Sequence, residues 1–161
     1  MALAMSIYPK LFRALTSINF LDRFERLRGQ FNKFPDFPFR ADPKIVKQKI
    51  ENFGYQTKYY RSESFFKIWR PGRSDQQLHL SVTQNKAEFI LNITIDGHTN
   101  GSPYTGCAID LSTEEQNAAR EYPHARPRFK NYDELYIILS AGFDLFDDLV
   151  KALDDIQNAE G

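Results

Sequence analysis

The apolar residues of this chain recur with two different periods, and the order of these periods limits the folds that it can adopt. In the first part they recur every three or four positions, as on one side of a helix: Leu11, Leu15, Ile18, Leu21, Phe24, Leu27 and Phe31. Between residues 55 and 95 apolar and polar residues alternate, which is typical of strands. The helical spacing returns after residue 131. Helices before and after a run of strands indicate the α+β class.

The alternating region divides into four predicted strands. Two of them lie at residues 55–60 and 65–70, on either side of a polar turn. The next two carry alternating apolar residues, namely Leu78, Leu80, Val82, Phe89, Leu91, Ile93 and Ile95. Such strands form an antiparallel meander with one covered face and one wetter face. Residues 96–103 are predicted to be a loop, and Cys107–Leu111 a short fifth strand.

Capping signals mark the helices that flank the sheet. Asp42 is a predicted N-cap, Pro43 takes the first helical position, and Gly54 suits the left-handed position after the last turn. Two capping boxes, at residues 112–115 and 131–134, predict a short helix that ends near residue 121 and a long final helix.

The length of 161 residues suits one domain with a sizeable core. We expect a single α+β domain over residues 1–161, with two N-terminal and two C-terminal helices packed mainly on one face of a four- or five-stranded antiparallel meander. Residues 1–6 are expected to be disordered or a cloning remnant. Gly142 predicts a bend or a split in the final helix, because glycine costs about 1 kcal/mol relative to alanine there.

Charge is balanced over the chain but divided along it. Residues 1–75 carry fifteen Lys and Arg against seven Asp and Glu, whereas residues 76–161 carry six against fourteen. The polar side of the final helix holds five of the acids: Asp144, Asp147, Asp148, Asp154 and Asp155. Three interpretations of these acids are open. They form a plain solvated face, they balance the basic helix at residues 43–53, or they bind a cationic partner protein through electrostatic steering.

An arm rich in phenylalanine and proline separates the first two predicted helices. Residues 31–39 contain four Phe together with Pro35 and Pro38, which cannot continue a helix. The arm either packs into the core or presents a docking surface, on which Phe37 and Phe39 are the candidate partner-binding residues.

The residues with chemical potential do not form a recognised motif. The best candidate nucleophile is Cys107, with His98 as its base and Asp96 or Asp110 as orienter, although cysteine is more often simply buried. The possible metal ligands match no structural zinc spacing: His79, His98, His124, Asp96 and Asp110. We therefore expect no catalytic residue, cofactor or metal.

The basic part of the chain offers an alternative surface for single-stranded nucleic acid. Aromatic residues on the predicted strands can stack on bases, namely Tyr59, Tyr60, Phe66 and Trp69. Nearby cations can neutralise phosphates, namely Lys44, Lys47, Lys49, Lys58, Arg61, Lys67, Arg70 and Arg73. The ribonucleoprotein aromatic motif is absent, and the overall pI of 6.8 lacks the positive excess that such modules usually have.

These features favour a non-enzymatic protein-binding domain, with a protein rather than nucleic acid or a membrane as the expected partner. The specific hypothesis is a bacterial immunity-type inhibitor that neutralises a toxin enzyme through an acidic and aromatic surface. The alternatives are a single-stranded nucleic-acid-binding module and, third, a Cys-dependent hydrolase. A single cysteine, no signal peptide and no membrane span predict a cytoplasmic protein, either a monomer or a homodimer.

Overall fold

The structure is a computed structural model, and it describes residues 9–119 and 126–160. Within these residues three helices precede the sheet: α2 (Pro9–Ser17), α3 (Phe20–Gln30) and α4 (Pro43–Asn52). The strands are β1 (Gln56–Tyr60), β2 (Phe65–Trp69), β3 (Gln76–Thr83), β4 (Lys86–Ile95) and β5 (His98–Pro103). Three further described helices follow: α5 (Tyr104–Leu111), α6 (Glu114–Ala119) and α7 (Tyr132–Glu160).

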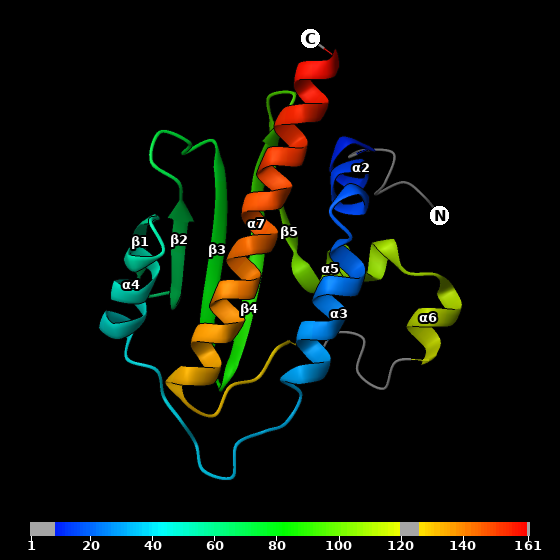
Figure 1. Cartoon of the computed structure of the whole chain (residues 1–161). Helices are drawn as coiled ribbons and strands as arrows, with labels where there is room; N and C mark the ends of the chain where they lie inside the picture. Colours follow the sequence, from blue (N-terminus) through cyan, green and yellow to red (C-terminus); the bar gives the residue numbers. More distant parts are fainter. Residues whose placement is uncertain (1–8, 120–125, 161) are drawn as a thin grey trace.

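The strands form one antiparallel sheet in which each strand pairs with its neighbours along the chain. In the middle of the sheet Phe66 lies opposite Leu80, which lies opposite Phe89 on the next strand. These residues are buried, whereas the residues between them on each strand are half-exposed. Figure 1 shows α7 crossing the face that buries them, with α2 and α3 beside it and α4 next to β1. The predicted α+β fold with an antiparallel meander is confirmed.

The close approach between α7 and the sheet occurs at Gly142. A Cβ atom on this glycine would clash with the ring of Phe89. The ring of Tyr104 stacks on Phe89 with centroids 5.0 Å apart, and its hydroxyl donates to the Gly142 carbonyl at 2.8 Å. The predicted split at Gly142 is wrong, because α7 is one continuous helix of 29 residues. The glycine instead makes room for an aromatic ring of the sheet.

The first predicted helix is in fact two helices. Asn19 has a left-handed backbone (φ 57°) between α2 and α3, a conformation that asparagine tolerates better than most residues. Leu15 of α2 and Phe24 of α3 are nevertheless both buried. The three- and four-residue spacing of apolar residues continues across this break, because a single left-handed residue changes the direction of the chain but inserts no extra residue into the pattern.

The predictions for residues 96–111 are wrong in both parts. Asp96 and Gly97 both have positive φ (51° and 80°) and form a tight turn, so that the segment predicted as a loop pairs with β4 as β5. Backbone pairing across a hairpin does not need alternating apolar residues, which is why the pattern missed it. Cys107–Leu111 belongs to α5 rather than to a strand, because Tyr104, Cys107 and Ala108 bury one side of a helix.

The predicted caps of α4 and of α7 are confirmed. The Asp42 side chain accepts the backbone N–H of Lys44 at 2.9 Å, and Gly54 has a φ of 92° after the end of α4. Asn131 caps α7 by accepting the N–H of Glu134, also at 2.9 Å.

The short helix α6 begins one residue later than its predicted box. Thr113 Oγ1 accepts the N–H of Gln116 at 3.1 Å, and Gln116 Oε1 accepts the N–H of Thr113 at 2.8 Å. Ser112 is instead used by the preceding helix, where its hydroxyl donates to the Ala108 carbonyl. The predicted end near residue 121 lies outside the described residues, as do residues 1–6.

The substitution Gly142→Ala tests the close approach. The gain of about 1 kcal/mol in helix propensity is smaller than the roughly 2–3 kcal/mol needed to displace a buried ring. We expect a net loss of about 1–2 kcal/mol in the free energy of unfolding, measured by urea denaturation. Gly29→Ala in α3 is the matched control, because no atom lies within 4 Å of its added Cβ, and it should stabilise by about 0.5–1 kcal/mol. A Gly142→Ala protein as stable as the Gly29→Ala protein would contradict the packing argument.

Candidate functional site

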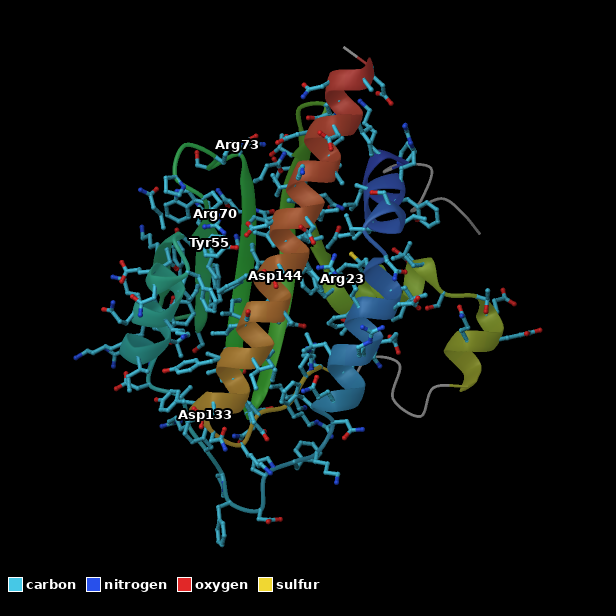
Figure 2. All side chains as sticks on the ribbon, viewed as in Figure 1. Arg23, Tyr55, Arg70, Arg73, Asp133 and Asp144 are labelled. Atoms are coloured by element: carbon cyan, nitrogen blue, oxygen red, sulfur yellow. The ribbon has the colours of Figure 1, made fainter. Side chains whose placement is uncertain are left out.

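The acidic residue Asp147 of α7 is held in a network rather than presented to solvent. Its carboxylate accepts the Tyr55 hydroxyl at 2.8 Å and Nε of Arg70 at 3.2 Å. The Arg70 guanidinium lies over the Tyr55 ring at 3.9 Å and also donates to the Phe53 carbonyl at 3.0 Å. Burial, and then the bond to Asp147, raise the pKa of Tyr55, so that its hydroxyl remains a donor. Figure 2 shows Tyr55, Arg70 and Arg73 on one side of α7 and Arg23 on the other.

Further ion pairs join α7 to the basic first half of the chain: Arg23–Asp148, Arg73–Asp154, Lys10–Glu160 and Arg13–Glu160. The basic partners come from α2, α3 and the loop after β2. The predicted packing of the acidic helix near residues 43–53 is observed, since Lys49 lies over the Tyr136 ring at 4.4 Å and Phe53 packs against Phe143. Among the described residues, however, no ion pair links α7 to the lysines of α4. Four carboxylates of α7 are thus paired with basic residues of the first half of the chain.

Two of the five predicted partner-binding carboxylates remain free for another molecule. Asp144 and Asp155 are exposed, and neither has an ion pair or hydrogen bond in the described part of the chain. Asp148 is exposed as well, but its carboxylate is bound to Arg23 at 2.9 Å. An acidic surface on α7 would therefore rest on isolated carboxylates and not on a continuous stripe.

The two ends of the Phe-Pro arm are anchored in the core. Phe31 is buried at the end of α3, and its carbonyl accepts the backbone N–H of Arg128 at 2.8 Å. At the other end the Phe39 ring packs edge-on against Tyr132 and Phe129, with centroids 4.8 and 6.0 Å apart. Of the two predicted partner-binding residues of the arm, Phe39 is thus half-buried in the protein itself.

The middle of the arm presents its phenylalanines to solvent. The side chain of Phe34 is 61% exposed and that of Phe37 is 83% exposed. The guanidinium carbon of Arg128 lies 3.6 Å from the centre of the Phe34 ring, which holds this ring against the protein. Phe37 has no aromatic or cationic contact of this kind among residues 9–119 and 126–160. The ends of the arm therefore pack into the core, whereas its middle is exposed, and a docking role for this middle part stays a prediction.

The outer face of the sheet, which no described helix covers, carries a second group of aromatic residues. The strand register divides the predicted stacking residues, because Tyr59 and Phe66 point to the inner face whereas Tyr60 and Trp69 point outward. Tyr60 stacks on Phe65 with centroids 4.8 Å apart, and Phe65 contacts His79 at 4.9 Å. Sequence reasoning missed Phe65 and His79, although the alternation of the strands places both on this face.

Two lysines flank these outward aromatic residues. Lys58 lies over Tyr60 and Lys67 over Trp69, at 5.1 and 5.6 Å from the ring centres. Burial, and then the charge of Lys67, lower the pKa of His79, which therefore adds no positive charge at neutral pH. Arg70 and Arg73 do not belong to this surface, because their guanidinium groups bind Asp147 and Asp154.

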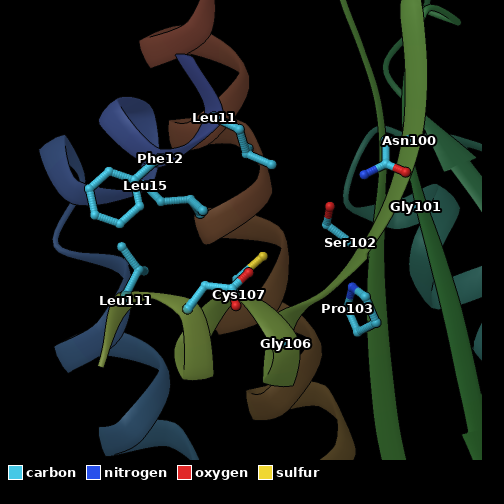
Figure 3. A pocket seen from close by; sticks show the side chains of 11 residues that line it. Leu11, Phe12, Leu15, Asn100, Gly101, Ser102, Pro103, Gly106, Cys107 and Leu111 are labelled. Atoms are coloured by element: carbon cyan, nitrogen blue, oxygen red, sulfur yellow. The ribbon is translucent and has the colours of Figure 1, made fainter. Parts of the chain in front are cut away.

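The candidate nucleophile Cys107 lies in a cavity of about 210 Å³ between α2, β5 and α5. Figure 3 shows its sulfur between the apolar residues of α2 and Ser102 of β5. Cys107 is only 4% exposed, and burial, followed by the charge of Asp110, raises the pKa of its thiol to about 12. His98 does not line this cavity, and Asp96 is bound to Lys10 at 2.9 Å. The thiol is therefore a buried neutral group rather than an activated thiolate.

Comparison with known protein families, curated proteins and solved structures finds no match for this chain. No three His, Cys, Asp or Glu side chains of the described residues gather closely enough to hold a metal, and His124 lies outside these residues. Within the same residues, every helix is too short or too polar to cross a bilayer. The surfaces described above are therefore the basis for a functional proposal.

The substitution Asp147→Asn tests whether the acidic helix stabilises the fold. It removes the charge that binds Arg70 and leaves one oxygen for three donors, namely the Tyr55 hydroxyl and two nitrogens of Arg70. We therefore expect a loss of about 1–2 kcal/mol in the free energy of unfolding. Asp155→Asn on the same helix is the matched control and should change stability by less than about 0.5 kcal/mol. Urea denaturation of both variants measures the difference. Equal stabilities would mean that the Asp147 network contributes nothing.

Proposed function

We propose that this chain is a non-enzymatic protein-binding domain whose main contact is the middle of the arm. Its specific form is an immunity-type inhibitor of bacterial origin that binds and neutralises a toxin enzyme. The observation that carries the proposal is Phe37, a large aromatic side chain that is 83% exposed. Exposed aromatic residues are enriched at protein interfaces, where burying one ring in a partner can supply much of the binding energy.

The arm is held in place before any partner arrives. The Asn85 side chain donates to the carbonyls of Phe39 and Phe129 at 2.7 and 3.1 Å. The backbone N–H of Asp42 donates to the Tyr132 hydroxyl at 2.8 Å. Binding through such a fixed loop costs less conformational entropy than ordering a free one. This rigidity supports a docking role for Phe37.

The free carboxylates of α7 support an inhibitor of a cationic enzyme. Asp144 lies twelve residues along α7 from Tyr132, which packs against the arm, a helix length of about 18 Å. A protein interface of standard size, about 800 Å² per partner, is large enough to include both the arm and Asp144. Such carboxylates would raise the association rate with a positively charged surface. A buried, unpaired Cys107 suits the reducing cytoplasm, where we place the protein.

The substitution Phe37→Ala tests the role of the arm. Immobilised wild-type protein should retain a specific protein from an extract of the source cell, and Phe37→Ala should retain at least about tenfold less of it. Ile45→Ala is the matched control, because Ile45 is also an exposed apolar residue (41%) but lies on α4, outside the proposed interface. Equal retention by both variants would contradict the arm as the binding site.

The identity of the retained protein tests the inhibitor form separately. It should be an enzyme that loses its activity when one equivalent of wild-type chain is added, and Asp144→Lys should slow the association. If the retained protein has no enzymatic activity, the chain is still a protein-binding domain, but the toxin-inhibitor hypothesis is wrong.

The outer sheet face favours a second candidate function, the binding of single-stranded nucleic acid. Trp69 is the only tryptophan of the chain and lies on this face beside Lys67. Stacking of a base should quench its fluorescence when an oligouridine of about ten nucleotides is added. The quenching should weaken strongly between roughly 50 and 200 mM salt. Lys67→Ala should reduce it, whereas Lys47→Ala on α4 should not; unchanged fluorescence at low salt would eliminate this candidate.

A further inference from the structure

A groove lies at the end of the sheet that is nearest to the arm. It is bounded by residues 38–41, where the arm ends and the chain leads into α4, by the turn between β1 and β2, and by the turn between β3 and β4. In Figure 1 the arm passes along this end of the molecule. The volume of the groove is about 620 Å³, which falls within the range of roughly 300–1,000 Å³ that is usual for small-molecule sites. Its size therefore suits an organic molecule of moderate dimensions.

Two arginines line this groove without an acidic partner. Arg40 comes from the end of the arm, where the chain leads into α4, and Arg61 from the turn after β1, and both are exposed. Neither guanidinium group has an ion pair or hydrogen bond within the part of the chain that the structure describes. The acids nearest in sequence, Asp42 and Glu63, do not line the groove, and the Asp42 carboxylate accepts the N–H of Lys44.

Most other described arginines bind carboxylates, among them Arg23, Arg28, Arg70, Arg73 and Arg126. Arg26 of α3, which lies outside the groove, is an exception. The groove therefore combines two positive charges with no negative charge in its lining. This local imbalance favours an anionic ligand that carries about two charges.

The floor of the groove is apolar and aromatic. Tyr59, Phe66 and Val82 belong to the inner face of the sheet, at a corner that the helix layer leaves partly open. Phe66 is fully buried, whereas Tyr59 and Val82 are half-buried and available to a ligand. The Tyr59 ring packs against Phe66, its neighbour on β2, with ring centroids 4.5 Å apart. A flat apolar group can therefore replace water on this floor.

The rim supplies hydrogen-bonding groups between the two arginines. Ser64, Thr83 and Gln84 line the groove from the two turns. Their hydroxyl and amide groups can donate to an anion or accept from the body of a ligand. The arm, which forms the opposite wall, is fixed by the contacts of Phe39 and Asn85 described above.

We propose that this groove binds an organic phosphate monoester whose aromatic part lies on Tyr59 and Val82, as a nucleoside monophosphate would. A phosphate monoester carries a charge of about −1.5 to −2 at neutral pH and three acceptor oxygens, which matches two free guanidinium groups. A monocarboxylate would leave one arginine without a counterion. The site does not depend on the protein partner, because its residues are complete in the single chain.

Titration with adenosine 5′-monophosphate (AMP) tests the site, followed by isothermal calorimetry and by backbone amide NMR shifts. We expect saturable binding, with the largest shifts at Tyr59, Val82 and Thr83. The double substitution Arg40→Ala and Arg61→Ala should weaken binding at least about tenfold. Arg26→Ala is the matched control, because Arg26 is an exposed arginine of α3 outside the groove. Its affinity for AMP should equal that of the wild type.

Titrations with adenosine and with inorganic phosphate test the contributions of the aromatic part and of the phosphate group separately. Adenosine should bind at least about tenfold more weakly than AMP because it lacks the charge, and phosphate should do so because it lacks the ring. The proposal is overturned if AMP does not bind up to roughly 10 mM, if the double variant binds it as tightly as the wild type, or if the shifts lie away from the groove. Both guanidinium groups are exposed and without a polar partner among the described residues, so the double variant should keep the fold, and equal melting temperatures will show this.

Discussion

The contact between Gly142 and Phe89 fixes the position of α7, and the rest of the structure depends on it. Protein interiors are close-packed, so a helix can approach a sheet this closely only where it has no side chain. Tyr104 completes the contact by stacking on Phe89 and donating to the Gly142 carbonyl, which ties α5 to the same point. With α7 placed in this way, Asp147 meets Tyr55 and Arg70, and residues further along the helix meet other basic partners.

The packing of α7 also decides which charges remain available to other molecules. Four carboxylates of α7 pair with basic residues from the first half of the chain, which lowers the charge that this helix presents to other molecules. The charges without a partner at the surfaces described here include the carboxylates of Asp144 and Asp155 and the guanidinium groups of Arg40 and Arg61. Recognition by this protein would therefore be directed by a few charges at defined places.

Three surfaces share one physical origin, because each is a part of the sheet or arm that the helix layer leaves uncovered. The outer face carries Tyr60, Phe65 and Trp69 beside two lysines. The arm holds Phe37 in solvent between two anchored ends. The groove exposes the Tyr59 corner of the inner face under the arm. The aromatic content of the chain is thus divided between a core that surrounds Phe89 and surfaces that are suited to binding.

The sequence by itself determined the α+β class, four of the five strands, both ends of α4 and the cap of α7, because these depend on period and on residues a few positions apart. It did not reveal the left-handed residue at Asn19 or the hairpin that makes β5, since neither alters the apolar period. It also could not separate the paired from the free carboxylates. Asp147 and Arg70 are 77 residues apart in the chain, and only the packing of α7 against the sheet brings such residues together. The exposure of Phe37 and the burial of Phe31 were decided in the same way, by where the core ends.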